Sequence, residues 1–141
     1  MQTFLPYPDF RQSLACLDYR RLGKQRVEGR QLESAIRTGT SRGWVNHPAS
    51  KMWAKNLDLL CLYTDMCIVE WVKRGYNNTM DYTFDPVCHG HIFGIMNKPD
   101  WLGDEAFHAS HRSNLLRKDP EWYGQFGWSE PHDLEYVWPV K

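Results

Sequence analysis

The sequence lacks the features that mark secreted, membrane-spanning or disulfide-stabilised proteins. No run approaches the ~18 apolar residues that a membrane helix requires, and the opening MQTFLPYPDF has no basic start and two early prolines, unlike a signal peptide. The cysteines have no C-x-x-C spacing, so we expect free buried thiols in a reducing compartment. They are Cys16, Cys61, Cys67 and Cys88. These absences predict a cytoplasmic protein without a membrane partner.

Sequence motifs for bound phosphate, metal or an activated serine are also missing. There is no glycine-rich phosphate loop, no G-x-S-x-G and no H-E-x-x-H. Zinc sites usually need four ligands at recognisable spacing. The neighbours Cys88, His89 and His91 supply half a site, and so does the pair His108 and His111. We therefore interpret these histidines as structural and expect neither a metal nor a cofactor.

What the chain does have is the composition of one ordinary globular domain. Its 141 residues fit a single domain over 1–141. The hydrophobic share of 42% and charged share of 24% exclude a disordered, collagenous or coiled-coil protein. The aromatic share is 14% and includes seven tryptophans. So many flat rings predict extensive packing or stacking on nucleobases.

Residue patterns predict an all-α fold of three main helices joined by long aromatic connections. The helical segments are 11–37, 49–74 and 104–118. Gly23 suggests a kink or break in the first helix, and Thr38–Gly43 (TGTSRG) a turn after it. Gly75 ends the second helix, and Asp119 followed by proline ends the third. No segment has a persuasive strand alternation.

Charge is unevenly distributed although the net charge is zero. Residues 1–43 carry eight Lys and Arg against four Asp and Glu. Most of these cations lie in DYRRLGKQRVEGR, which contains Arg20, Arg21, Lys24, Arg26 and Arg30. Cations at i,i+4 share a helix face, and guanidinium groups bind phosphate oxygens in pairs. The segment therefore predicts either a phosphate-binding face or a solvated helix face paired with Asp18 and Glu28.

Aromatic residues dominate the end of the chain. The segment PEWYGQFGW contains Trp122 and Tyr123. Such rings either pack against the core or stack on nucleobases. Packing is the more frequent outcome, and the sequence leaves both open.

Four collinear segments resemble the phage pyrimidine-dimer DNA glycosylase/lyase family of the endonuclease V type and its bacterial relatives. DYRRLGKQRV is similar to the family's Tyr-Arg-Glu-Leu-Pro-Arg-Val, with two extra residues, and VKRGY to its Lys-Arg-Gly-Phe. GDEAFHAS and PEWYGQFG are similar to its Gly-Asp-…-His-Glu-Ala-Ser and Pro-Thr-Trp-Tyr-…-Tyr-Gly. The N-terminal MQTFLPYPDFR and the segment NHPASKMW are closer still to an uncharacterised bacterial branch.

The resemblance implies a compact helical domain that cuts the glycosidic bond at a damaged pyrimidine without a metal. In the family, the N-terminal amine attacks the sugar C1′, forms a Schiff base and leads to strand scission by β-elimination. A carboxylate on the first helix moves protons, arginines hold phosphates, and a base leaves the stack. The expected partner is therefore DNA.

Only part of the family's site is reproduced in this sequence. Arg20, Arg26 and Arg117 match basic positions of the family, and Arg21 stands where the family has its catalytic Glu. Glu28, two turns further along the helix, is the substitute that we assign, and Asp18 is the other carboxylate within reach. Because Gln2 is a large second residue, Met1 is expected to be retained and to supply the amine.

The same features also fit a protein that binds a nucleotide without catalysis. Arg20, Arg21, Lys24 and Arg26 would hold one or two phosphates while Trp122 or Tyr123 stacks on the base. A reversed charge at the catalytic position adds a phosphate ligand, and a neutral protein needs no long DNA track. Such a protein could sequester a modified or cyclic nucleotide signal in phage defence.

Overall fold

The computed structural model describes residues 2–39 and 44–139, and within these ranges it is helical and contains no strand. The all-α prediction is therefore confirmed. The three longest helices are α2 (Tyr19–Thr38), α4 (Leu57–Lys73) and α6 (Glu105–Lys118). Shorter helices connect them: α1 (Phe10–Cys16), α3 (Pro48–Trp53), α5 (His89–Ile95) and α7 (Pro120–Tyr123). Single 3-10 turns lie at Trp44–Asn46, Pro86–Cys88 and Gly124–Phe126.

Two of the predicted helices are interrupted where the sequence pattern gave no warning. The first ends at Cys16 and restarts at Tyr19, because Leu17 and Asp18 adopt extended backbone angles and Asp18 becomes the N-cap of α2. The second is divided at residues 54–56 into α3 and α4. The predicted turn at Thr38–Gly43 overlaps the end of α2, and its residues 40–43 lie outside the described ranges.

Gly23 does not mark the break that we predicted. It lies inside α2, where an added Cβ would come 3.1 Å from the ring of Trp71 on α4. Gly29 is tighter, since a Cβ there would lie 2.2 Å from Thr64 Oγ1. Both glycines therefore let α2 and α4 approach closely, which is a requirement of helix packing that a single-helix pattern does not reveal.

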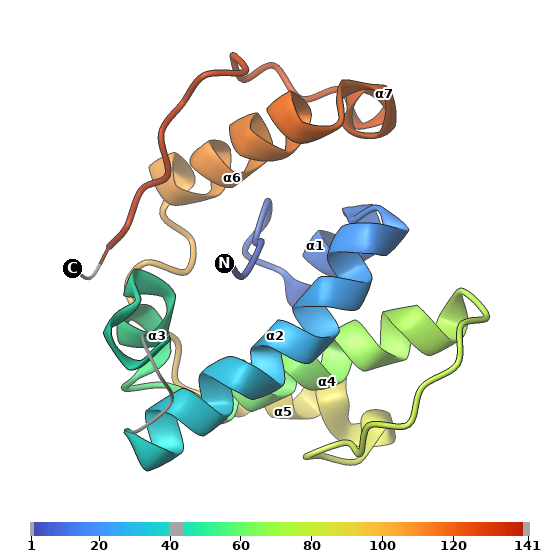
Figure 1. Ribbon diagram of the computed structural model, residues 1–141, viewed down its shortest axis with the longest axis vertical. Helices are drawn as coiled ribbons and strands as arrows, with labels where there is room; N and C mark the ends of the chain where they lie inside the picture. Colours follow the sequence, from blue (N-terminus) through green and yellow to red (C-terminus); the bar gives the residue numbers. More distant parts are fainter. Residues whose placement is uncertain (1, 40–43, 140–141) are drawn as a thin grey trace.

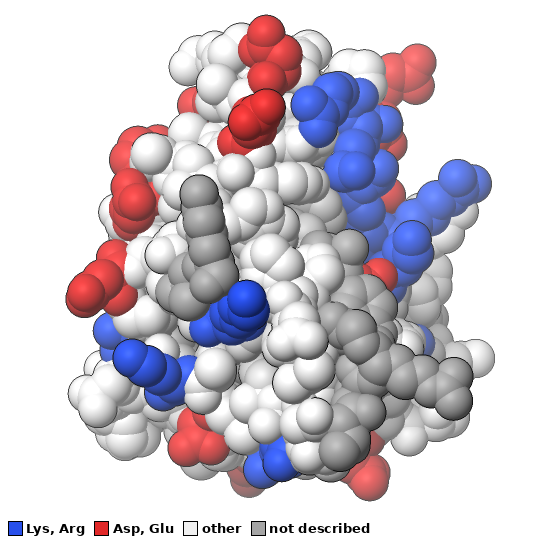
Figure 2. Space-filling model, turned by 60° about the vertical axis from the view of Figure 1, so that its left-hand side comes forward, with Lys and Arg blue, Asp and Glu red and all other residues white. Residues whose placement is uncertain are grey.

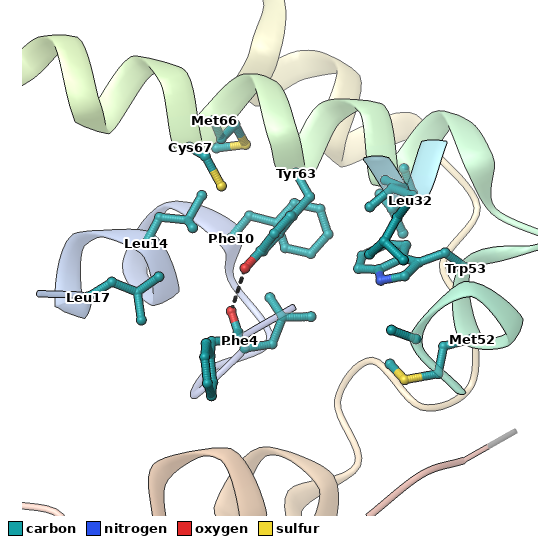
Figure 3. Close-up of a cluster of buried hydrophobic side chains, with 14 of the residues drawn as sticks. Phe4, Phe10, Leu14, Leu17, Leu32, Met52, Trp53, Tyr63, Met66 and Cys67 are labelled. Atoms are coloured by element: carbon teal, nitrogen blue, oxygen red, sulfur yellow. Dashed lines mark hydrogen bonds between the residues drawn. The ribbon is translucent and has the colours of Figure 1, made fainter. Parts of the chain in front are cut away.

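The core lies between the α2–α4 pair, α1 and the N-terminal segment (Figure 1). Figure 3 shows Tyr63 of α4 pointing into this core, where its hydroxyl donates to the carbonyl of Phe4 at 2.8 Å. Phe10 meets the Tyr63 ring edge-on at 5.4 Å between centroids. Trp53 is fully buried beside them. The first residues of the chain are therefore part of the core.

One side of the N-terminal segment is held by α2. The buried Gln25 side chain donates to the carbonyl of Gln2 at 2.6 Å and accepts from the amide of Phe4 at 2.9 Å. The same Gln25 oxygen lies 2.8 Å from Tyr63 Oη, whose single hydrogen is shared between it and the Phe4 carbonyl. Both the backbone and the side-chain amide are thus paired, as buried polar groups require.

The other side is held by α6, which lies above the N-terminus in Figure 1. The amide of Leu5 donates to His111 Nδ1 at 2.9 Å, and its carbonyl accepts from His108 Nδ1 at 2.7 Å. The next carbonyl, of Pro6, accepts from Arg112 at 2.7 Å. The sequence suggested structural histidines, and these two bond the amide and the carbonyl of a single residue, Leu5.

This arrangement requires His111 to stay neutral and makes stability pH-dependent. Burial lowers the pKa of His111 to about 3, with a further contribution from the charges of His108 and Arg112. An unfolded chain protonates histidine near pH ~6.5. The stability that His111 contributes is therefore complete above that pH and is lost as pH falls toward 3. We expect the free energy of unfolding to drop by about 2 kcal/mol from this group between pH 6.5 and 4.5.

Urea unfolding followed by circular dichroism at the two pH values measures this drop. In His111→Asn the side-chain oxygen can still accept from Leu5, but nothing titrates, so the pH dependence should shrink. His132 is exposed, and His132→Asn should keep the full pH dependence. A His111→Asn protein as acid-sensitive as the wild type would assign the effect to other groups.

The cysteines depart from the prediction at one position. All four are free; Cys16, Cys61 and Cys67 are buried, but Cys88 is exposed. Cys88 ends a short 3-10 turn directly before α5, and this turn has no buried residue.

No helix in the described ranges is long and apolar enough to cross a membrane.

Candidate nucleic-acid interface

A pocket of about 1420 Å³ opens between the N-terminal segment, the first half of α2 and the end of α6 with α7. The turn after α4 contributes Tyr76 to its wall. Five residues selected from the sequence line it: Arg20, Arg21, Lys24, Glu28 and Trp122. The structure thus brings together residues that are more than a hundred positions apart in the chain, Arg20 and Trp122.

Positive charge gathers at this pocket. Arg20, Arg21 and Lys24 come from α2, and Lys118 joins them from the last residue of α6. Burial lowers the pKa of Lys118, and the charges of Arg21, Arg117 and Lys24 lower it further. Arg74 also lines the pocket, and so do the carboxylates of Asp18, Glu28, Glu70 and Asp119. Because Asp18 pairs with Arg21 and Glu70 with Arg74, the pocket attracts an anion mainly through Arg20, Lys24 and Lys118. Figure 2 shows Lys and Arg side chains in a band along one side of the molecule, with acidic groups mostly on the other side.

Arg21 is oriented by a buried hydrogen-bond network at the break between α1 and α2. Its Nη1 lies 3.1 Å from Asp18 Oδ1, and the same carboxylate accepts from Tyr123 Oη. The amide of Asp18 donates to Tyr123 Oη at 3.1 Å. Burial alone would raise the pKa of Asp18, but the hydrogen bonds from Tyr123 and Arg21 outweigh it and lower this pKa. Asp18 is thus an ionised carboxylate engaged in structure.

Glu28 is the carboxylate that remains available in the pocket. It lies on α2, is half-buried and lines the pocket wall. No hydrogen bond or ion pair joins its carboxylate to another residue that the structure describes. A carboxylate without a structural partner beside cations can accept a proton or stabilise a developing positive charge.

Two of the selected arginines do not line the pocket. Arg26 donates to Asn78 Oδ1 at 2.7 Å, and its guanidinium lies 5.0 Å from the ring of Trp71. It therefore packs the loop after α4 against α2. Arg117 is exposed and donates to Asn114 of its own helix. Its charge still acts on two residues of the pocket, Lys118 and Tyr136.

The structure separates the two aromatic residues that we selected for base stacking. Trp122 is 38% exposed, lines the pocket and donates from Nε1 to the carbonyl of Cys16 at 2.7 Å. Tyr123 is fully buried, and its ring stacks on Trp128 at 5.7 Å. The expectation that Tyr123 contacts a base is corrected, because its ring is buried and its hydroxyl is bonded to Asp18.

Met1 lies outside the described residues, so the position of its amine is not described. Its neighbour Gln2 lines the pocket and is 5% exposed. Gln2 Oε1 accepts from the amide of Thr3 at 2.9 Å, whereas its Nε2 has no hydrogen-bond partner. The described start of the chain is therefore a wall of the pocket.

Sequence reasoning missed several residues of the pocket. The sequence predicts Lys118 as the last residue of a helix and assigns phosphate binding to its neighbour Arg117 instead. Gln25 was passed over as an uncharged position within a basic segment, yet it fixes Gln2 beside the pocket. Tyr19 and Tyr76 also line it. Both tyrosines stand in segments that carried the family resemblance, which was the available signal.

The histidines form no metal site in the part of the chain that the structure describes, where no three His, Cys, Asp or Glu side chains are grouped to hold an ion. His89 Nε2 lies 3.2 Å from Asp65 Oδ2 and 3.3 Å from the carbonyl of Phe84. His89 thus has a structural position next to a buried carboxylate.

The fold and the pocket together define a class: an all-helical protein with a basic, aromatic pocket suited to a nucleic acid. A family model described as pyrimidine dimer DNA glycosylase matches residues 1–84, which is more than half of the chain. The protein belongs to the pyrimidine dimer DNA glycosylase family, as the resemblance indicated. Comparisons with curated proteins and with solved structures gave no match.

Proposed function

We propose that the protein is a DNA glycosylase and abasic-site lyase that acts on damaged pyrimidines through the amine of Met1. The amine attacks C1′, the glycosidic bond breaks, and the base leaves with the bonding electrons. The nitrogen loses a proton, and the C1′–O4′ bond then opens as O4′ takes up a proton, which gives a C1′=N Schiff base. Removal of a C2′ proton finally expels the 3′ phosphate. An α-amine suits this role because its ordinary pKa of ~7.7–8.0 leaves part of it neutral near pH 7.

The observation that carries this proposal is the pocket wall at Gln2. Gln25, Tyr63 and the α6 histidines hold the segment from Gln2 to Leu5 by both sides of its backbone. A chain start that is fixed this firmly beside Arg20, Arg21 and Lys24 supports an amine that meets a sugar–phosphate backbone. The coarser part of the proposal follows from family membership.

Each remaining role follows from position in the pocket. Arg20, Arg21, Lys24 and Lys118 bind phosphate oxygens, since all four line the pocket. Glu28 takes the proton and stabilises the positive charge that develops at C1′. Trp122 stacks on a base. Arg26 and Arg117 support these groups from outside the pocket.

Borohydride trapping tests the proposal. The protein with a free N-terminus is incubated with a duplex that contains an abasic site, and sodium borohydride then reduces any Schiff base to a stable adduct. We expect an adduct whose modified peptide is the N-terminal one. A matched protein with a short uncleaved extension before Met1, shown by thermal unfolding to be folded, should give none.

Other outcomes decide against the proposal in different ways. An adduct on Lys118 would keep the lyase activity but overturn the role of Met1. No adduct, together with a thermal shift on adding mononucleotides, would favour the nucleotide-binding alternative. In that case Arg21→Glu should weaken nucleotide binding, whereas in a lyase it should restore the family's charge and favour cleavage.

A further inference from the structure

Exposed aromatic rings concentrate at the pocket. Three of the large hydrophobic side chains described as exposed are aromatic: Tyr19 at 50%, Tyr76 at 40% and Trp122 at 38%. All three line the same pocket, whereas the exposed aliphatic side chains, such as Val27 and Val87, do not. Exposure of apolar rings to water is unfavourable, and a cluster of exposed rings often marks a binding surface. The shared location of these three rings therefore indicates a ligand or partner that covers them.

Tyr76 is held by the turn that ends α4. Gly75 has a φ of +93°, a left-handed conformation that favours glycine, and it folds the chain back over the helix end. The amide of Tyr76 reaches the carbonyl of Trp71 at 3.3 Å, and the two rings lie 4.3 Å apart at 30°. One ring therefore supports the other.

The Trp71 ring that supports Tyr76 is itself held firmly in place. Its Nε1 donates to the carbonyl of Asn77 at 2.7 Å, and its ring approaches Gly23 of α2 so closely that a Cβ would lie at 3.1 Å. The guanidinium of Arg26 lies over the same ring. The orientation of Tyr76 is thus fixed by both helices before any ligand arrives.

Tyr19 extends this stack at the start of α2. Its ring lies 6.3 Å from that of Tyr76 at an interplanar angle of 32°. Arg20 Nε donates to Tyr19 Oη at 3.1 Å, and the Arg20 guanidinium lies 5.6 Å from the ring. Arg20, which we assign to phosphate binding, therefore lies directly beside two exposed rings.

We propose that Tyr19 and Tyr76 form a stacking platform for an unpaired nucleobase whose phosphate is held by Arg20. A base within a duplex has both faces covered, so only a base outside the stack can lie on these rings. The platform is built by α2 and the turn after α4, and is a separate base contact from Trp122 on α7. That the base belongs to DNA rests on the proposed function.

Photocrosslinking tests the platform without requiring catalysis. The probe is a duplex with 5-iodouracil opposite a tetrahydrofuran residue, so that the iodouracil has no pairing partner. Tetrahydrofuran cannot form a Schiff base, and irradiation links iodouracil to a ring stacked on it. We expect the linked peptide to contain Tyr19 or Tyr76.

Substitutions of the two tyrosines test the platform quantitatively, through the crosslink yield and the affinity for the probe. Tyr76→Ala and Tyr19→Ala should each lower the crosslink yield and weaken probe binding by about 5- to 150-fold. Tyr76→Phe keeps the ring and should bind as the wild type does. Val27→Ala removes an exposed side chain of α2 outside the pocket and should change nothing.

The outcomes separate the platform from the lyase proposal. Crosslinks confined to other residues, such as Trp122, or yields unchanged in both alanine variants, would overturn the platform. A platform crosslink in a protein that gives no borohydride adduct would keep the platform and reject the lyase. The two alanine variants remove different exposed rings. If one variant fails to fold, the other still tests the platform.

Discussion

Glu28→Gln is expected to slow cleavage of an abasic-site duplex by about 10²–10⁴-fold and to leave DNA binding nearly unchanged. Glutamine keeps the shape of the side chain but can neither accept a proton nor carry a negative charge. Because Glu28 has no partner among the described residues, the substitution should not disturb the fold. Single-turnover cleavage of a labelled duplex, with binding followed by fluorescence anisotropy, measures the two effects separately.

Glu121→Gln is the matched control. Glu121 is exposed on α7 and does not line the pocket, so this variant should cleave at the wild-type rate. If Glu28→Gln also cleaves at the wild-type rate, Glu28 is not the catalytic carboxylate. The role would then pass to Asp18, the other carboxylate considered from the sequence, despite its bonds to Arg21 and Tyr123.

Asp65→Ala is expected to lower the free energy of unfolding by about 3–5 kcal/mol. Asp65 is fully buried on α4, and its carboxylate accepts from the amides of Thr83 at 2.8 Å and Phe84 at 2.7 Å. It also lies 3.2 Å from both Arg30 and His89. Alanine would leave the two amides without their acceptor and would remove one of the two carboxylates that pair with Arg30, the other being Glu33.

Urea unfolding at pH 7 tests this loss, with Asp58→Ala as the control from the same helix. Asp58 is exposed in the first turn of α4, where its interaction with the helix dipole contributes less than about 1 kcal/mol. Equal stability of the two variants would mean that the Asp65 network does not hold α2, α4 and the 81–84 segment together.

Local patterns predicted the long helices because their signals lie within a few residues. Asp104 caps α6 through the amide of Ala106, and the helix ends at Lys118 as predicted. The division at Leu17 and Asp18 was missed because it depends on Tyr123, more than a hundred residues away, which binds the Asp18 backbone and carboxylate. Propensity along one segment contains no information about such a partner.

The same limit applies to the pocket. Arg20, Arg21 and Lys24 were predictable because their charge density and spacing are visible in the sequence. Arg26 has the same charge and stands in the same segment, yet it packs on Trp71. Which face of α2 meets the pocket is decided by its contact with α4, where Gly29 permits the closest approach. Charge identifies candidate ligands, and packing selects among them.

The hold of α6 on Leu5 limits how this chain could be shortened or recombined. The family match ends at residue 84, but His108, His111 and Arg112 lie beyond it and pair with the backbone of Leu5 and Pro6. The portion that carries the family signature is therefore not a transferable module. A homologue with a different second half must supply its own donors and acceptors for the leading residues, or lose the position that sets them in the pocket wall.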